Sequence, residues 1–254
     1  MHTMFDFNAK LGHWPYRPVG GLDALLKAMA AYGVGCAAVS SLDAVHFFNP
    51  QDGNERLAQA VGPYLDRLVP FAVLRPNFTG WEADLDRCLG EYGMKGVVLY
   101  PNYHGYQLDD PALGRLMTEA ARQGFPVCVQ TGLEDLRRQF RPYKVDAVPA
   151  DAIGAFARAY PEAVVVALGL KINEPERAGE PLPDNFYFDT SNYETMGELE
   201  RAVDKFGAEK ILFGSGFPLF NPRANVDKVR LAAIDEAARA AIAAENGRGI
   251  LGIG

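Results

Sequence analysis

Short apolar runs alternate with longer amphipathic stretches along the whole chain. The runs are rich in valine, isoleucine and phenylalanine, and most lack the alternation of apolar and polar residues that marks a strand with one solvated face. This pattern predicts parallel strands that are buried on both faces. Eight such runs occur, at residues 5–8, 36–40, 68–74, 96–100, 125–130, 164–168, 186–189 and 210–213.

The amphipathic stretches between these runs predict helices. Four of them end just before Gly33, Gly93, Gly124 or Gly207. Glycine is expected directly after a helix because it adopts the left-handed conformation of a C-terminal cap without steric cost. The predicted helices cover residues 22–32, 55–64, 81–92, 111–123, 150–160, 196–206 and 223–246.

Eight strands that alternate with helices over 254 residues fit an α/β fold of the (β/α)8 TIM-barrel type. An open doubly wound sheet is the alternative, but the chain has no phosphate-binding glycine fingerprint. No linker interrupts the pattern, so we expect one TIM-barrel domain over residues 1–254. Active-site groups follow the C-terminal ends of barrel strands, where the connections here are long. These connections are residues 8–20, 41–53, 101–109, 131–149, 169–185 and 214–222.

Composition narrows the function classes. The net charge is −7, and no basic stripe or basic amphipathic helix indicates a nucleic-acid or membrane partner. The three cysteines, Cys36, Cys88 and Cys128, are too far apart for a zinc knuckle and do not suggest a disulfide framework. The first residues lack the pattern of a signal peptide, and no apolar run is long enough to span a membrane. We expect a cytoplasmic protein whose partner is a small-molecule substrate or ligand.

Several segments in order resemble one known family. They are FDFNAKLG at 5–12, NERLAQAVGPYLDRLVPFAVLRP at 54–76, the segment 96–132 that ends in VQTG, KILFGSGFP at 210–218 and ENGRGILGI at 245–253. Together they resemble the amidohydrolase-related proteins, in the branch that includes aminocarboxymuconate-semialdehyde decarboxylase. The resemblance implies a metal-dependent-hydrolase fold, hydrolase or lyase activity, and association into a homo-oligomer.

The same resemblance identifies where the metal ligands of that family would lie. The two histidines of the Asp-x-His-x-His-x-Gly frame become Asn8 and Lys10, and the histidine of a VHTG segment becomes Gln130. The aspartate of a GSDYP segment becomes Gly216, and no histidine occurs in residues 164–170. Amides and an ammonium are poor zinc ligands. The sequence therefore predicts a degenerate metal site and no metal cofactor, with zinc as the alternative.

An unconventional metal site is a separate alternative. His13, His46 and His104 follow three of the predicted strands, and Asp189 ends another. Histidine nitrogens and a carboxylate are ordinary zinc ligands. Isolated loop histidines are also common as polar surface or substrate-binding groups.

Three residues are candidates for catalysis. Lys10 lies where a metal-bound histidine would lie, and a partly buried lysine has a lowered pKa that suits a base or Schiff-base nucleophile. The alternative is a structural lysine whose ammonium replaces the charge of the metal and pairs with Asp189. His104 is a candidate acid–base group by its near-neutral reference pKa, or else a solvated loop residue. Asp189 is a candidate base or the partner of Lys10.

Other residues are candidates for substrate binding. In the loop after the first strand, Trp14 would contact a ring and Arg17 would bind a carboxylate, or else they would pack and pair within the loop. Gln130 would orient a substrate or tie loops together, since a buried amide needs partners. The full set of predicted substrate-binding residues is Asn8, His13, Trp14, Arg17, Tyr100, Gln130 and Ser215.

The connection at residues 134–144 is a candidate lid. It reads EDLRRQFRPYK and carries Arg137, Arg138, Arg141 and Lys144 against two acids. Such a loop would cover the mouth with an anion-binding side, or remain a solvated loop or subunit contact.

These observations support three hypotheses. The first is a metal-independent hydrolase or carboxy-lyase for a small anionic or cyclic substrate. The second is a non-catalytic barrel that binds a small ligand, because a fold does not imply a function. The third is a metallohydrolase with atypical ligands.

Overall fold

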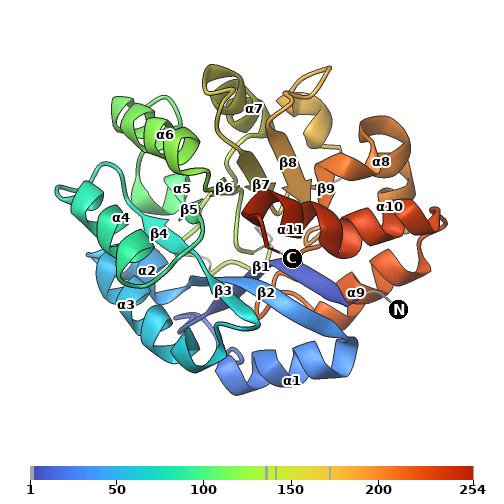
Figure 1. Ribbon diagram of the computed structural model, residues 1–254, viewed down its shortest axis with the longest axis horizontal. Coiled ribbons are helices and arrows are strands. Elements are labelled where there is room, and N and C mark those ends of the chain that lie inside the picture. The colour runs from blue at the N-terminus through green and yellow to red at the C-terminus, as the bar shows by residue number, and fades with distance from the viewer. Residues whose placement is uncertain (1–2, 135–136, 141, 172, 254) are drawn as a thin grey trace.

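The structure, a computed structural model, describes residues 3–134, 137–140, 142–171 and 173–253. It is an α/β barrel whose strands run parallel and whose helices form an outer ring (Figure 1). The strands in the described part of the chain are β1 (Met4–Leu11), β2 (Val34–Ser41), β3 (Leu68–Pro70), β4 (Ala72–Leu74), β5 (Val97–Leu99), β6 (Val127–Gln130), β7 (Val165–Leu168), β8 (Phe186–Asp189) and β9 (Ile211–Leu212).

Backbone hydrogen bonds close the barrel. The strands pair in chain order, as β1-β2-β3 and as β4-β5-β6-β7-β8-β9. The N–H of Phe7 donates to the carbonyl of Phe213, and that of Lys10 donates to the carbonyl of Phe217, each at 2.8 Å. These bonds join the chain after β9 to β1, so the predicted (β/α)8 barrel is confirmed.

The predicted third strand, residues 68–74, is divided at Phe71. The segment β3 pairs with β2, whereas β4 pairs with β5. The N–H of Phe71 donates to the carbonyl of Val39 at 2.8 Å, so the chain stays in contact with β2 while it moves across. The two segments together occupy the place of one barrel strand.

The helices follow the predicted stretches with small changes of bounds. The longer ones are α1 (Leu22–Tyr32), α3 (Pro50–Val61), α4 (Trp81–Gly90), α6 (Pro111–Gln123), α7 (Ala150–Ala159), α8 (Glu198–Phe206) and α9 (Pro222–Leu231). Gly33 and Gly124 end α1 and α6 in the left-handed conformation, with φ of 67° and 74°. Two four-residue helices, α2 (Asp43–His46) and α5 (Pro101–His104), lie in connections that were expected to be loops.

The last predicted helix, residues 223–246, is wrong as one element. After α9 the chain turns to extended backbone at Ala232, where ψ is 141°. Asp235 then begins a new helix by accepting a hydrogen bond from the N–H of Ala238 at 2.7 Å, as an N-cap aspartate does. The rest consists of α10 (Glu236–Ala240), a π-helical turn (Ala241–Glu245) and α11 (Asn246–Leu251).

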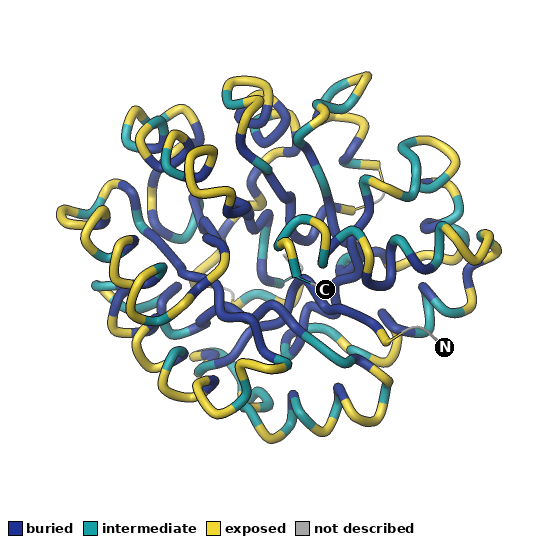
Figure 2. Tube along the Cα trace, viewed as in Figure 1, coloured by how far each residue is buried: buried dark blue, intermediate teal, exposed yellow. Residues whose placement is uncertain are grey.

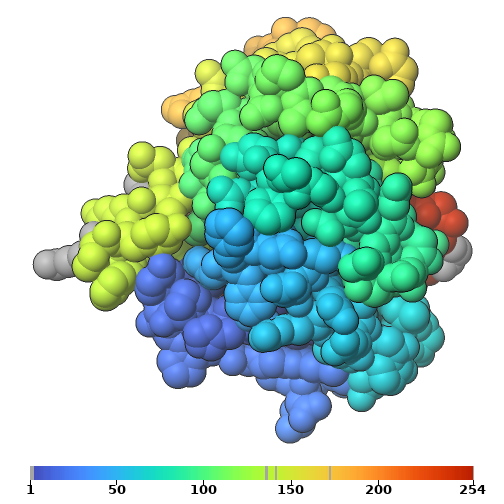
Figure 3. Space-filling model, turned by 90° about the vertical axis from the view of Figure 1, so that its left-hand side faces the viewer, coloured from blue at the N-terminus to red at the C-terminus, as the bar shows by residue number. Residues whose placement is uncertain are grey.

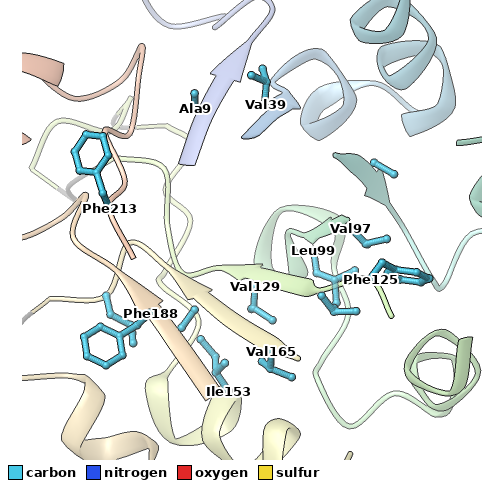
Figure 4. Packing of buried hydrophobic residues seen from close by; sticks show 14 of the residues in the cluster. Ala9, Val39, Val97, Leu99, Phe125, Val129, Ile153, Val165, Phe188 and Phe213 are labelled. Atoms are coloured by element: carbon cyan, nitrogen blue, oxygen red, sulfur yellow. The ribbon is translucent and has the colours of Figure 1, made fainter. Parts of the chain in front are cut away.

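Apolar residues fill two layers. One cluster lies between strands and helices, and includes Val97, Val129, Val165 and Ile153 (Figure 4). Figure 2 shows the matching pattern, with buried strands and with helices exposed along their outer edges. The second cluster fills the barrel interior and includes Phe5, Phe7, Phe71, Val98 and Cys128.

The C-terminal helix closes the end of the barrel where the strands begin. A Cβ added to Gly247 in α11 would lie 2.6 Å from the Phe5 ring, and the side chain of Asn246 donates to the carbonyl of Ile211 at 2.8 Å. A functional site is therefore expected at the opposite end, where the strands finish. Within the described ranges, no helix has the length and apolar character needed to cross a membrane.

Candidate active site at the mouth of the barrel

The finishing end of β1 carries a buried polar group. Lys10 is only 2% exposed, and its Nζ donates to Oδ1 of Asn8. The amide of Asn8 in turn donates to Oδ2 of Asp189 at 2.7 Å and to Oγ of Ser191 at 3.1 Å. The Lys10 ammonium and the Asp189 carboxylate, which lie far apart in the sequence, are thus joined through the Asn8 amide.

This arrangement corrects the expectation of a direct ion pair. Lys10 and Asp189 have no salt-bridge contact with each other; Asn8 lies between them. The second oxygen of Asp189 accepts the N–H of Gly169 at 2.6 Å, so both carboxylate oxygens are occupied. Asn8 acts here as a relay between charges.

Asp6, which the sequence reasoning did not select, shapes the strand. Its Oδ1 accepts the N–H of Asn8 at 3.0 Å, and the pairing of β1 with β2 shifts register between Asp6 and Ala9. Such a bulge re-aims the side chains that follow it. Asp6 also accepts the N–H of Ser215 at 2.8 Å and its hydroxyl at 2.5 Å. Asp6 is the aspartate of the Asp-x-His-x-His frame, and that match was the signal that could have identified it.

Burial disfavours the charged form of Lys10, Asp6 and Asp189. Desolvation lowers the pKa of Lys10 to about 8, although the carboxylates of Asp189 and Asp6 act in the opposite direction. Desolvation also raises the pKa values of Asp6 and Asp189, against the hydrogen bonds that each receives. The mouth of the barrel therefore holds a lysine whose pKa is lowered to about 8.

Hydrogen bonds from helix α9 support the cluster around Lys10 and Asp189. Asn225 donates to the carbonyls of Ser191 and Ser215, at 3.2 and 2.5 Å. Its own Oδ1 accepts from Nζ of Lys228 at 2.6 Å. Asn225 thereby ties together the connections that follow β8 and β9, and no sequence pattern indicated this role.

Two more predicted residues lie on neighbouring strand ends. The hydroxyl of Tyr100 is 3.3 Å from Oγ of Ser40, which pairs with Lys10 across β1 and β2. Gln130 ends β6, and its Nε2 donates to the carbonyls of Gly132 and Leu168 at 2.8 and 3.1 Å. Its Oε1 is buried and has no partner among the described residues. Gln130 ties loops and also presents one unpaired acceptor.

The ring of His104 makes no hydrogen bond with Lys10 or Asp189. The expectation of a solvated loop histidine is wrong, because His104 ends α5 and is 4% exposed. Its ring lies near Tyr100 and Tyr106, with centroids 6.1 and 6.5 Å away. Among the described residues, neither ring nitrogen has a hydrogen-bond partner. Desolvation lowers the pKa of His104 to about 4, although backbone groups of Ala44, Val45 and Leu74 act in the opposite direction. The structure therefore gives His104 the features of a neutral buried ring.

Aromatic rings from two connections cover the mouth. Tyr16, in the connection after β1, stacks with Phe140 and Tyr143 from the connection after β6, at centroid distances of 5.4 and 5.9 Å. Arg17 donates to Glu134 at 3.1 Å and to the carbonyl of Leu219 at 3.0 Å. Figure 3 shows the chain near residue 140, in yellow-green, projecting beside the dark-blue N-terminal segment.

The cover leaves little room beneath it. A cavity of about 10 Å³ remains among the aromatic rings, and another of about 10 Å³ lies inside the barrel beside Asn8 and Ser40. Each holds about one water molecule. This closed arrangement leaves no room for a ring-sized ligand beside Lys10. The candidate lid, residues 134–144, forms part of the cover; Arg141, part of its predicted basic side, lies outside the described residues.

Trp14 is buried beneath Tyr16, and its Nε1 has no partner among the described residues. His13 is exposed and uses its backbone N–H to bind Asp43 at 2.9 Å. His46 packs against the rings of Trp14 and Tyr103. The charge of His13 acts on His46, but the described residues hold no metal-binding group that includes the three loop histidines.

The donor set does not suit a metal ion. At the places of the family ligands stand an amide, an ammonium, a second amide and Gly216, which has no side chain. An ammonium has no lone pair to give and repels a cation. Across the described ranges, no group of three histidine, cysteine or acidic side chains has metal-binding placement.

Comparison with known proteins agrees with the fold. The family model described as Amidohydrolase matches residues 2–253. Among curated proteins, no match was found.

Three solved structures illustrate the likeness over nearly whole chains. A dihydroxybenzoic acid decarboxylase from Polaromonas with bound manganese has a TM-score of 0.79 at 17% identity, covering 99% of this chain and 97% of that one. A 2,6-dihydroxybenzoate decarboxylase from Rhizobium has 0.76 at 18%, covering 99% of each. A probable 2-pyrone-4,6-dicarboxylic acid hydrolase from Acinetobacter baumannii has 0.69 at 13%, covering 99% and 100%.

Proposed function

The chain belongs to the amidohydrolase family, and on that premise we propose that it is a metal-independent carboxy-lyase for a small, ring-bearing carboxylic acid. One observation carries the proposal. The ammonium of Lys10 is buried at the end of β1, where the family places a metal ligand, and Asn8 connects it to Asp189. A fixed positive charge in a dry site is what an anionic transition state requires.

The proposed reaction needs one proton donor. Nζ of Lys10 donates a proton to the ring carbon that bears the carboxylate. The carbon–carbon bond then breaks, its electron pair returns to the ring, and carbon dioxide leaves. Lys10 regains its proton from water, and Asp6 and Asp189 favour the return to ammonium because their charges raise its pKa.

Hydrolysis is the second candidate, and it requires a base to activate water. The carboxylates of Asp6 and Asp189 are already occupied by hydrogen bonds, and the ring of His104 makes no hydrogen bond with this cluster. Neutral Lys10 is the remaining base, since its pKa of about 8 leaves part of the amine unprotonated near that pH. The similar structure of a probable 2-pyrone-4,6-dicarboxylic acid hydrolase makes this reading worth testing.

Substrate recognition in the proposal comes from the mouth and its cover. When the lid opens, Arg17 exchanges Glu134 for the carboxylate of the substrate, and Trp14 contacts the ring. Gln130 offers its unpaired Oε1 to a hydroxyl group on the ring. Two similar structures are decarboxylases of dihydroxybenzoic acids, so we propose hydroxylated aromatic acids as the first substrates to examine.

The test is an assay of metal-stripped protein. Protein dialysed against a chelator, with less than about a tenth of an equivalent of metal per chain, is incubated with hydroxybenzoic and pyrone carboxylic acids. We expect release of carbon dioxide that the chelator does not reduce and that disappears in Lys10→Met. Activity that appears only when manganese or zinc is added would overturn the proposal. Binding without turnover would instead support the ligand-binding barrel.

A further inference from the structure

A second buried carboxylate lies outside the barrel mouth, at the start of α8. Glu198 is 6% exposed, and its Oε1 accepts the hydroxyl of Thr195 at 2.5 Å. Its Oε2 is buried and has no hydrogen-bond partner in the described part of the chain. A buried carboxylate oxygen without a partner is costly, so this atom is poised to accept a donor.

Glu198 lines a pocket of about 310 Å³ between the start of α8 and the helix α9. Three further carboxylates line the same pocket, from Glu194, Glu200 and Asp227. Lys228 is the one cation among the lining residues, and its Nζ is already engaged with the carbonyl of Tyr193 and with Asn225. Asp227 also pairs with Arg223 at 3.5 Å, so four carboxylates face two cations. The remaining negative charge makes the pocket attractive to a positively charged ligand.

Part of the pocket wall is apolar. Met196 and Leu231 are 97% and 80% exposed at its edge, and Ala224 and Ala232 also line it. An alkyl chain would cover these side chains and remove them from water. A metal ion fits poorly, because a hard cation needs six or more oxygen ligands and the unpaired acceptor here is a single oxygen.

We propose that this pocket binds a primary alkylammonium group, which donates to Oε2 of Glu198 while its carbon chain packs between Met196 and Leu231. A diamine suits the pocket best, since its second ammonium meets the exposed carboxylate of Glu194. The site is separate from the mouth of the barrel, and it does not depend on the proposed lyase activity.

Isothermal titration calorimetry with 1,4-diaminobutane tests the proposal on the intact chain. We expect a dissociation constant near or below about 1 mM, weaker binding of n-butylamine, and weaker still of tetramethylammonium, which has no N–H donor. Glu198→Gln should weaken diamine binding about ten-fold or more, since a hydrogen bond between charged groups is lost. Glu162→Gln makes the same charge change at an exposed position outside the pocket and should leave binding unchanged.

A second variant guards against misfolding of Glu198→Gln. Ala224 is exposed at the pocket edge, so Ala224→Arg should fold and should block the diamine by charge and bulk. Equal binding in wild type and both variants would overturn the proposal. So would the absence of diamine binding in the wild type, including the case in which sedimentation shows a second copy covering this face.

Discussion

Two buried regions of the molecule hold ionisable side chains in opposite ways. Around Lys10, the carboxylates of Asp6 and Asp189 accept hydrogen bonds from both backbone and side chains, and Asn8 joins charge to charge. Around His104, neither ring nitrogen has a hydrogen-bond partner among the described residues, and only the backbone of Ala44, Val45 and Leu74 acts to raise its pKa. Burial alone therefore does not identify a reactive group. A charge survives burial only where dipoles and counter-charges hold it.

The largest expected effect comes from Lys10. Lys10→Met keeps most of the length of the side chain but removes the proton donor and the positive charge. We expect turnover to fall by about a hundred-fold or more, the range for a lost acid or electrostatic group. The measurement is kcat for carbon dioxide release, with Lys27→Met, an exposed lysine of α1, as the matched control. Unchanged turnover in a folded Lys10→Met protein would remove Lys10 from the mechanism.

Next in size is the loss of a carboxylate from the same cluster. Asp189→Ala leaves the Asn8 amide and the N–H of Gly169 without their acceptor and takes away a counter-charge of Lys10. We expect the free energy of unfolding in urea to fall by about 3–5 kcal/mol. Asp204→Ala, at an exposed position in α8, should change it by less than about 0.5 kcal/mol. Equal losses of unfolding free energy in the two variants would show that the hydrogen bonds to Asp189 do not stabilise the fold.

The contrast also predicts how stability depends on pH at His104. Its pKa is lowered from 6.5 to about 4, so the unfolded chain binds the proton more readily and stability falls as pH drops through this window. Between pH 7 and pH 5 the loss should be about 2 kcal/mol in the wild type. His104→Phe should lack this loss while keeping turnover at pH 7. A parallel loss in the variant would assign the pH dependence to other groups.

The smallest effect on stability is expected at the cover. Arg17 is one-third exposed in its pair with Glu134, so Arg17→Met should cost less than about 1 kcal/mol of unfolding free energy. If Arg17 receives the substrate carboxylate, KM should rise about ten-fold while kcat changes less. Arg122→Met, in a pair on the outside of α6, is the control. A fall in kcat with constant KM would place Arg17 in the chemical step instead.

Most of the fold was accessible from the sequence. Continuous apolar runs and glycine-capped helices are local signals, and they specified the strand order and the bounds of α1 and α6. The division at Phe71 and the break at Ala232 were not accessible, because each depends on which distant strand or helix the chain meets.

The site was accessible only in part. The family frame identified Asn8 and Lys10, and Asp189 was a candidate because it ends a predicted strand. The structure joins the three side chains. It could not show that Asp6 bends β1 through a side-chain bond to the backbone of Asn8, or that Asn225 ties two loops from behind. The position of His104 depended on α5, a helix of four residues that is too short to produce a periodic pattern.

The protonation of Lys10 tests the central claim most directly. In metal-stripped protein with 13C-labelled lysine, NMR titration follows the carbon next to each Nζ, and Lys10→Met identifies the signal of Lys10 and separates it from Lys228. We expect Lys10 to titrate near pH 8, as an ammonium held in a dry site by Asn8, Asp6 and Asp189. A transition at or above the ordinary lysine pKa of about 10.4 would contradict it.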